Sequence, residues 1–433
     1  MPNKKMVTVI LALLLTGSLL FAAGSGETDE SVTVKIAYPI AVDAPVADIL
    51  NGMAAQFESE HSNVTIETVY AGGYTDVKTM LQTTIDGGGD PPALTVMLAT
   101  DLFDLSNAQY IQPMTSLIEA MPNSEEYIGD FLPAFMENSY YNDEIWSLPF
   151  QRSAVVLYYN ADLLEEEGVP VPDSWETLAE AGQKLTVRNG SEVTRWGIEW
   201  PSGWPYWLFQ PLAMGAGQNI VGDDDAEVFF DDPAVIDAIE YYNSLSADYG
   251  AMPQGVQAAW GNVVPNLVSG NTAMIVHSSG SLSSLLAQAD FEVGVMGIPG
   301  RTPGTQFSVP GGGNLYITAG LDERVQQIAF DFAVFLTRPE NAAAFSIQTG
   351  YIATRDSSFD DPAMKTFIAE NPQAGMTREI LEFAGKELAL QNLGEVRSIF
   401  HNYIQAAFNG EMSAADAMAQ AQKEADAALA DFR

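Results

Sequence analysis

An alternation of strand-like and helix-like segments, which begins after residue 31, is the feature that most constrains the fold of this chain. Residues 32–37 and 64–69 alternate apolar and polar side chains as half-buried strands do, and 93–98 is a short apolar run. Between these segments, apolar residues recur at helical spacing in 46–57 and 76–85. This order predicts an α/β fold in which helices cover a mostly parallel sheet. In such a sheet, ligands bind on loops at the carboxyl ends of the strands.

The alternation continues through the rest of the chain, with recognisable helix starts. Ser174 precedes a helical pattern, and Asp232-Pro233 combines a capping side chain with a proline at the first helical position. The segment 297–313 is rich in glycine and proline, which predicts a loop. The other expected elements are strands at 154–159, 272–276, 291–296 and 314–318, and helices from about 162 and at 234–245, 324–336 and 413–431.

The first residues carry an export signal rather than a part of the fold. Lys4 and Lys5 precede an apolar run over 6–21, and small residues follow at 22–24, which is the order of a secretory signal peptide spanning residues 1–24. An uncleaved membrane anchor is the alternative, but the run is short for a bilayer span and a Thr-Gly-Ser sequence interrupts it. No cysteine follows to carry a lipid. We therefore expect an exported, soluble protein, periplasmic or extracellular, without a lipid anchor.

The charge of the chain excludes several partners. Its 57 acidic and 18 basic residues give a net charge of −39, whereas binding to nucleic acid or anionic lipid depends on lysine and arginine. The acidic excess is typical of solubility, including in saline surroundings, and a cationic ligand or partner is the alternative. Without cysteine there are no disulfides and no thiolate ligands for a metal. The three histidines, His61, His277 and His401, lie far apart in the sequence, so a zinc site or a histidine-based catalytic triad is not expected. We expect no cofactor and no metal.

Catalytic motifs of the common hydrolases, metalloproteases and nucleotide-binding enzymes do not occur in the sequence. The acidic run 223–227 lacks the spacing of a calcium loop and predicts a solvated turn. Ser278 beside His277 suggests a nucleophile, but adjacent residues of a strand point to opposite faces. Abundant carboxylates always allow some acid–base pair, so a secreted glycoside hydrolase is the alternative to a binding protein.

Four of the seven tryptophans fall in one short stretch that proline and glycine interrupt, which predicts a loop rather than one helical stripe. Aromatic rings on a loop suit a sugar or polyol, and they also suit a quaternary ammonium group. The alternative is that the rings pack between lobes or under a loop, which we favour for Trp196 and Trp200. Trp204 and Trp207 are the expected binding residues.

Several motifs, in this order along the chain, resemble the extracellular solute-binding proteins of ABC sugar importers. The resemblance is strongest to the glycerol-3-phosphate-binding branch of the maltose-binding-like group. It implies a type II periplasmic-binding-protein fold, with two α/β lobes around a three-segment hinge and a ligand cleft between them. The motifs are Leu148-Pro149-Phe150 with Leu157-Tyr158-Tyr159-Asn160, Trp175-Glu176-Thr177-Leu178, Ala273-Met274 with Ser278-Ser279-Gly280-Ser281, Arg338-Pro339-Glu340-Asn341-Ala342-Ala343, and Thr349-Gly350-Tyr351.

The resemblance also implies lobe boundaries and ligand-binding residues. The N-terminal lobe would comprise residues 31–148 and 305–348, and the C-terminal lobe residues 152–300 and 355–433. Ser278 begins a serine-glycine turn whose hydroxyl and amides could hold an oxygen or a phosphate. The positions that match the binding pocket of this branch are Tyr74, Ser153, Trp204, Trp207, Ser278, Gly312 and Tyr351.

Two positions depart from that branch. Its glycerol-binding glutamate falls near Ala99, and Asp101 is the nearest carboxylate that could replace it. Its phosphate-binding arginine falls near Phe400, while Arg397 lies one helical turn earlier and so could share the same face. Arg152 is another possible partner for an anion. The ligand is therefore a sugar, a polyol or a glycerol phosphomonoester or phosphodiester, and the net charge favours a neutral one.

These observations predict the substrate-binding component of an ABC importer rather than an enzyme. The solute would bind one lobe, and contacts from the other lobe would then favour the closed state. The expected partners are the solute and the transmembrane subunits of an ABC permease, and we expect a monomer. Besides the glycoside hydrolase, a purely structural module or a binding module that presents its ligand to a chemoreceptor is a second alternative.

Overall fold

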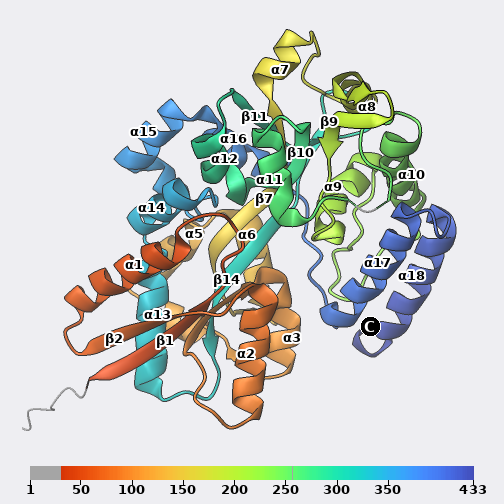
Figure 1. The fold of residues 1–433 in the computed structure, drawn as a ribbon. Coiled ribbons are helices and arrows are strands. Elements are labelled where there is room, and N and C mark those ends of the chain that lie inside the picture. Colours follow the sequence, from red (N-terminus) through yellow and green to blue (C-terminus); the bar gives the residue numbers. More distant parts are fainter. Residues whose placement is uncertain (1–30, 256) are drawn as a thin grey trace, which may run out of the picture.

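A computed structural model describes residues 31–255 and 257–433, so the predicted signal peptide lies outside the described residues. Within these residues, one curled sheet connects two groups of helices (Figure 1). The first three strands are parallel, whereas the strands in the middle of the sheet are antiparallel. In order across the sheet, the strands are β2 (Val64–Tyr70), β1 (Val32–Tyr38), β3 (Leu94–Leu98), β14 (Pro310–Thr318), β7 (Leu148–Asn160), β10 (Thr272–Ser278), β9 (Glu192–Glu199) and β8 (Val187–Asn189), with β4 (Ile111–Gln112) beside β14 and β11 (Val293–Met296) beside β7.

Helices pack on both groups of strands, and those that the sequence predicts begin within two residues of the expected start. Ser174 accepts a hydrogen bond from Thr177 N, and Asp232 accepts one from Ala234 N, so both predicted caps are confirmed. The longer helices are α1 (Val46–Glu60), α2 (Tyr74–Asp86), α8 (Trp175–Leu185), α9 (Pro205–Ala216), α10 (Pro233–Ala247), α11 (Trp260–Val268), α13 (Glu323–Leu336), α14 (Pro339–Thr349), α15 (Pro362–Glu370), α16 (Pro372–Glu379), α17 (Leu393–Phe408) and α18 (Ala414–Ala428). No helix within 31–255 or 257–433 is long and apolar enough to cross a bilayer.

Two lobes with separate apolar cores make up the predicted type II fold. One core lies among β1, β3, α1 and α13, and a larger one lies among β7, α8, α9, α10, α17 and α18. β7 contributes Phe150 to the first core and Val155 to the second, and it runs beside β14 through the centre of the molecule (Figure 1). Tyr351 packs in the first core, whereas the next residue, Ile352, packs in a third cluster with the far half of β7. The residue-level lobe boundaries given above stay a prediction.

The prediction of a mostly parallel sheet was wrong for the sheet as a whole. Among the named strands of residues 31–255 and 257–433, parallel pairing is confined to β1 with its two neighbours and to β9 with β10. The middle of the sheet is antiparallel because β14, which lies between β3 and β7, runs antiparallel to both of them.

The predicted loop 297–313 was also partly wrong, because β14 already begins at Pro310. Gly311 and Gly312 pair with Ser153 and Arg152 of β7. A Cβ on Gly311 would overlap the indole of Trp207, and one on Gly312 would overlap the backbone of β7. These glycines therefore allow close packing in a strand rather than a flexible turn.

Candidate functional site

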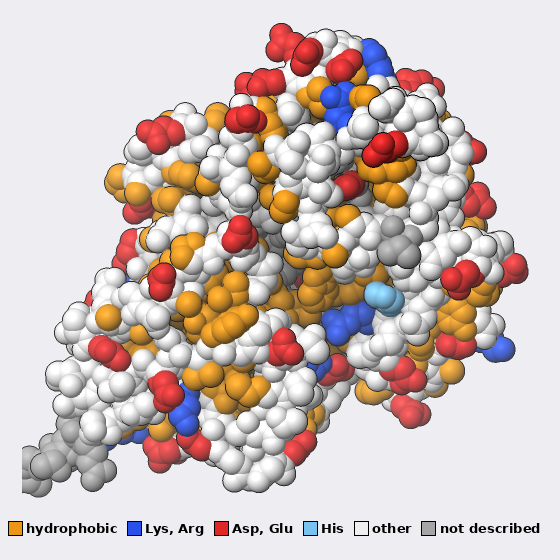
Figure 2. Space-filling view, viewed as in Figure 1, with side chains coloured by type: hydrophobic (Ala, Val, Ile, Leu, Met, Phe, Trp, Pro, Cys, Tyr) orange, Lys and Arg blue, Asp and Glu red, His pale blue; other side chains and the backbone are white. Residues whose placement is uncertain are grey.

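A cavity lies between the two lobes, where β7, β14 and the residues after α14 meet. Figure 2 shows a hollow near the middle of the molecule, with apolar side chains inside it. Some lining residues belong to the core of the first lobe and others to the core of the second. The lining residues are Ala41, Val42, Tyr74, Leu98, Ser153, Trp204, Tyr206, Trp207, Trp260, Ser278, Gly311, Gly312, Tyr351 and Glu387.

Most of the predicted binding residues meet at this cavity, although they come from segments far apart in the sequence. Tyr74 lies at the start of α2, and Tyr351 lies two residues after the end of α14. The structure thus places seven of the nine predicted residues around one space, and their role in binding stays a prediction. They are Tyr74, Ser153, Trp204, Trp207, Ser278, Gly312 and Tyr351.

Two tyrosine hydroxyls meet at the wall of the cavity. The hydroxyl of Tyr74 lies 3.3 Å from that of Tyr351 and donates to Oε1 of Gln151 at 3.2 Å. Burial raises the pKa of Tyr351 to about 12 and raises that of Tyr74 well above its usual value. Both hydroxyls therefore stay protonated at neutral pH and can donate to or accept from a solute.

Aromatic rings form another part of the wall. The indole of Trp207 donates from Nε1 to the carbonyl of Pro310 at 2.8 Å, which fixes the ring against β14. The ring centroid of Trp260 lies 6.4 Å from that of Trp207, and Trp260 also stacks on His277 at 3.8 Å. Trp204 adopts a left-handed conformation immediately before α9. The rings are thus held in place as rigid apolar faces.

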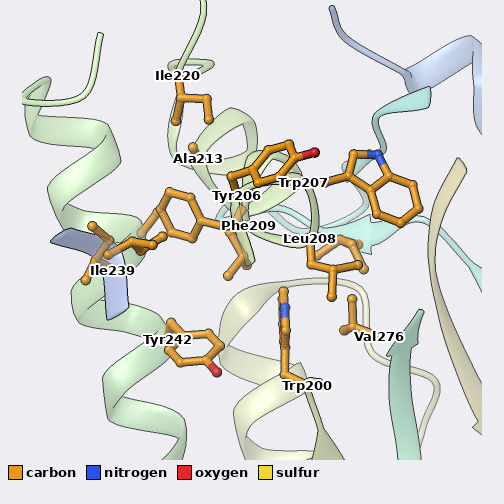
Figure 3. Close-up of a cluster of buried hydrophobic side chains, with 14 of the residues drawn as sticks. Trp200, Tyr206, Trp207, Leu208, Phe209, Ala213, Ile220, Ile239, Tyr242 and Val276 are labelled. Carbon is orange, nitrogen blue, oxygen red and sulfur yellow. The ribbon is translucent and has the colours of Figure 1, made fainter. Parts of the chain in front are cut away.

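The tryptophan stretch is only partly the loop that its prolines predict, because Trp200 and Trp204 lie between β9 and α9 whereas Trp196 and Trp207 lie in these elements. Pro205 starts α9, so Trp207 lies in a helix. Trp200 is only 3% exposed and packs edge-on against Tyr242, inside the apolar core that Figure 3 shows. Trp196 lies in β9 beneath the guanidinium of Arg188. The structure thus separates two cavity tryptophans from two that do not line the cavity.

Ser278 and His277 face different surroundings, as adjacent strand residues should. Oγ of Ser278 accepts from Gly280 N at 3.1 Å, which forms the predicted turn, and the side chain lines the cavity. Nδ1 of His277 instead lies 3.0 Å from Oγ of Ser281.

Asp101 and Arg397 were expected in the pocket, but the structure places neither of them at this cavity. Asp101 is 2% exposed and pairs with Nζ of Lys78 at 2.9 Å. Arg397 lies on α17 and lines an adjoining cavity together with His401. Trp204 and Tyr206 line both cavities, so they form the partition between them. Nη1 of Arg397 is buried and has no hydrogen-bond partner in the described part of the chain.

Arg152, the other candidate for an anion, is also engaged elsewhere. Its side chain is 0% exposed and lies over the ring of Phe135. Its Nη1 donates to the carbonyl of Gly312 at 3.3 Å, and its Nη2 lies 3.4 Å from Oε2 of Glu387. The guanidinium therefore lies behind the wall of the cavity, where a carboxylate already compensates its charge.

Glu387, Tyr206 and Trp260 also line the cavity, but they were not among the predicted binding residues. Tyr206 lies inside the tryptophan stretch and could have been included with it. Glu387 is one of 57 acidic residues, and no motif surrounds it. Burial raises its pKa to about 7, although Arg152 and Asn138 act in the opposite direction.

Comparison with known proteins identifies the family. Residues 52–374 match the family described as bacterial extracellular solute-binding protein. The chain belongs to this family. It is thus a substrate-binding component of an ABC importer and not an enzyme, and the predicted export is confirmed.

Individual known proteins are similar to this solute-binding protein over most of its length. The sn-glycerol-3-phosphate-binding periplasmic protein UgpB of Pectobacterium atrosepticum is 24% identical over 411 residues, which cover 88% of either chain. UgpB from Mycobacterium tuberculosis, solved with glycerophosphocholine, has a TM-score of 0.81 at 21% identity and covers 92% of this chain and 99% of that one. The GacH receptor of Streptomyces glaucescens, solved unliganded and with acarbose, has a TM-score of 0.80 at 20% identity and covers 93% and 100%. These similarities confirm the fold.

Proposed function

We propose that this protein captures a small polyhydroxylated solute in the cavity between its lobes and delivers it to the permease of an ABC importer. The observation that carries the proposal is the convergence of hydroxyl groups and rigid aromatic rings from both lobes on one cavity. Aromatic faces contact the C–H groups of a sugar or polyol, and hydroxyls bind its oxygens. The solute class is thus a sugar, a polyol or a glycerol phosphate ester.

An anionic group on the solute would fit in the adjoining cavity rather than among the tyrosines. Arg397 lines that cavity, and its guanidinium lies over the ring of Tyr206. Since Trp204 and Tyr206 face both spaces, one solute could extend past them. The relatives named above, which bind glycerol phosphate compounds or acarbose, support both neutral and phosphorylated candidates.

Closure of the lobes would trap the solute. Hydrogen bonds already connect opposite sides of the cleft, from Ser284 Oγ to Asp43 at 3.2 Å and from Asn107 Nδ2 to Gln391 at 2.7 Å. A solute that touches both lobes adds contacts that only the closed state makes, so it shifts the population towards closure. The permease would then recognise the closed monomer.

A thermal-unfolding screen tests this function. The panel comprises maltose, ribitol, sn-glycerol 3-phosphate, glycerophosphocholine and choline. A compound present at about 100 times its Kd stabilises the folded state by about 2.7 kcal/mol, which a shift in Tm reports. Calorimetric titration then measures the affinity. Absence of a shift with every polyhydroxylated compound of the panel would contradict the proposal.

Replacement of a single ring checks whether the cavity is the binding site. We expect Trp204→Ala to weaken binding of the best panel compound by about 1–3 kcal/mol, because a desolvated platform is lost. Trp200→Phe is the matched control, since Trp200 lies in the core and does not line the cavity. Equal affinities of the Trp204→Ala variant and the wild type, with the fold retained, would place the site elsewhere.

A further inference from the structure

One carboxylate oxygen at the cavity is fixed and the other is free. Oε2 of Glu387 accepts from Nδ2 of Asn138 at 3.0 Å and lies 3.4 Å from Nη2 of Arg152. Oε1 has no hydrogen-bond partner within 31–255 and 257–433, and it is not among the fully enclosed polar atoms of this part of the chain. Since Glu387 lines the cavity, this is the space that Oε1 can reach.

The backbone on both sides of Glu387 is held in place by one buried amide. Nε2 of Gln210 donates to the carbonyl of Lys386 at 3.2 Å, and Oε1 of Gln210 accepts from Leu388 N at 3.2 Å. Gln210 is 0% exposed and lies on α9, the helix that also carries Trp207 into the cavity wall. The carboxylate and the aromatic wall are thus positioned by the same rigid element, as a binding site requires.

The surroundings of Glu387 favour one class of ligand group. A phosphate at this point would meet a carboxylate, which repels it. An ammonium group would lie close to Arg152, which already compensates the charge of Glu387. A hydroxyl group avoids both conflicts, because it donates a hydrogen bond to Oε1 without adding a charge.

We propose that Glu387 determines the specificity of the cavity by accepting, through Oε1, a hydrogen bond from a hydroxyl group of the solute. This inference rests on the proposed function, which places a polyhydroxylated solute in the cavity. It extends that function by assigning the hydroxylated end of the solute to the Glu387 side and any anionic end to the Arg397 side.

The variant Glu387→Gln tests the assignment with little change of shape. The amide oxygen of the variant should remain with Arg152 and Asn138, since both donate hydrogen bonds, which turns the amide nitrogen towards the cavity. The acceptor thus becomes a donor. Glu137→Gln is the matched control, because Glu137 is a nearby glutamate that does not line the cavity.

Affinities are measured by calorimetry at about pH 8.5, above the raised pKa of Glu387, so that the carboxylate is ionised and Oε1 can only accept. The compounds are ribitol, maltose and sn-glycerol 3-phosphate, each with analogues that lack one hydroxyl. For compounds that the wild type binds, we expect Glu387→Gln to weaken binding about tenfold to hundredfold and Glu137→Gln to leave it unchanged. Loss of one particular hydroxyl should weaken binding to the wild type strongly and to Glu387→Gln much less. A merely structural role of Glu387 would not produce this dependence on one hydroxyl.

Three results would overturn the inference. Equal affinities of Glu387→Gln and the wild type, with the fold retained by circular dichroism, would refute it while the proposed function stands. A selective loss of choline or glycerophosphocholine binding, without dependence on any hydroxyl, would make Glu387 a partner of an ammonium group instead. If the wild type binds no polyhydroxylated compound of the panel, the proposed function and this inference both fail.

Discussion

The buried Glu387 should make the stability of the protein depend on pH in an unusual direction. Carboxylates that are paired in a folded protein usually have lowered pKa values, but burial raises the pKa of Glu387 from 4.5 to about 7. Between these values the folded state binds a proton that the unfolded state has lost. The contribution of Glu387 to stability is therefore fully present below pH 4.5 and is lost as the pH rises to about 7. At about 1.4 kcal/mol for each pKa unit, the loss is about 3 kcal/mol.

Urea unfolding of the wild type and of Glu387→Gln, at pH steps from 4 to about 8, isolates this contribution. The variant lacks the titrating group, so the free energy of unfolding of the wild type minus that of the variant should fall by about 3 kcal/mol across this range. The m-values should agree, which shows that both proteins unfold from similar states. A difference that rises with pH would refute the reasoning, because it would mean that pairing with Arg152 outweighs burial.

Three further changes follow from the same contacts. Burial lowers the pKa of His277 from 6.5 to about 4, so its contribution of about 3 kcal/mol is lost as the pH falls through this range, and His277→Gln should remove that dependence in the urea assay. Gly311→Ala should displace the indole of Trp207 and lower both thermal stability, by about 1–3 kcal/mol, and solute affinity measured by calorimetry. Arg152→Met should destabilise the protein by about 3–5 kcal/mol, whereas the double variant with Glu387→Met should regain most of that loss in chemical unfolding.

Local signals in the sequence were sufficient for most of the fold. The alternating strands β1 and β2 and the caps at Ser174 and Asp232 lie where the pattern predicts them. These features depend on residues close together in the chain, so they can be interpreted without knowledge of the tertiary structure.

The glycines of β14 show where local interpretation fails. A run of three glycines, Gly311 to Gly313, is typical of a loop, yet these residues belong to β14 and pair with β7. A Cβ on Gly313 would lie 2.7 Å from the ring of Tyr74, which is far away in the sequence. The need for glycine thus comes from side chains of other segments, which a local pattern does not contain.

The cavity was predicted in part, and the missing parts have a common cause. Tyr74, Ser278 and Tyr351 belong to recognisable motifs, and the structure brings them together. Glu387 does not, because its environment is created by Arg152 and Asn138, which are 235 and 249 residues away. A buried carboxylate differs from an exposed one only through such distant partners, so its importance appears only once the chain is folded.

Arg152 connects the wall of the cavity to the segments that join the two lobes. Its side chain contacts Glu387 and the carbonyl of Gly312, and its own carbonyl accepts from Ile352 N at 2.8 Å. This one residue of β7 therefore touches β14, the segment that follows α14, and the carboxylate at the cavity wall. A solute that donates a hydrogen bond to Glu387, as proposed above, would therefore bind beside the residue that connects these segments. Solutes that reach only the aromatic wall lack this connection, and they should bind without closing the protein as completely.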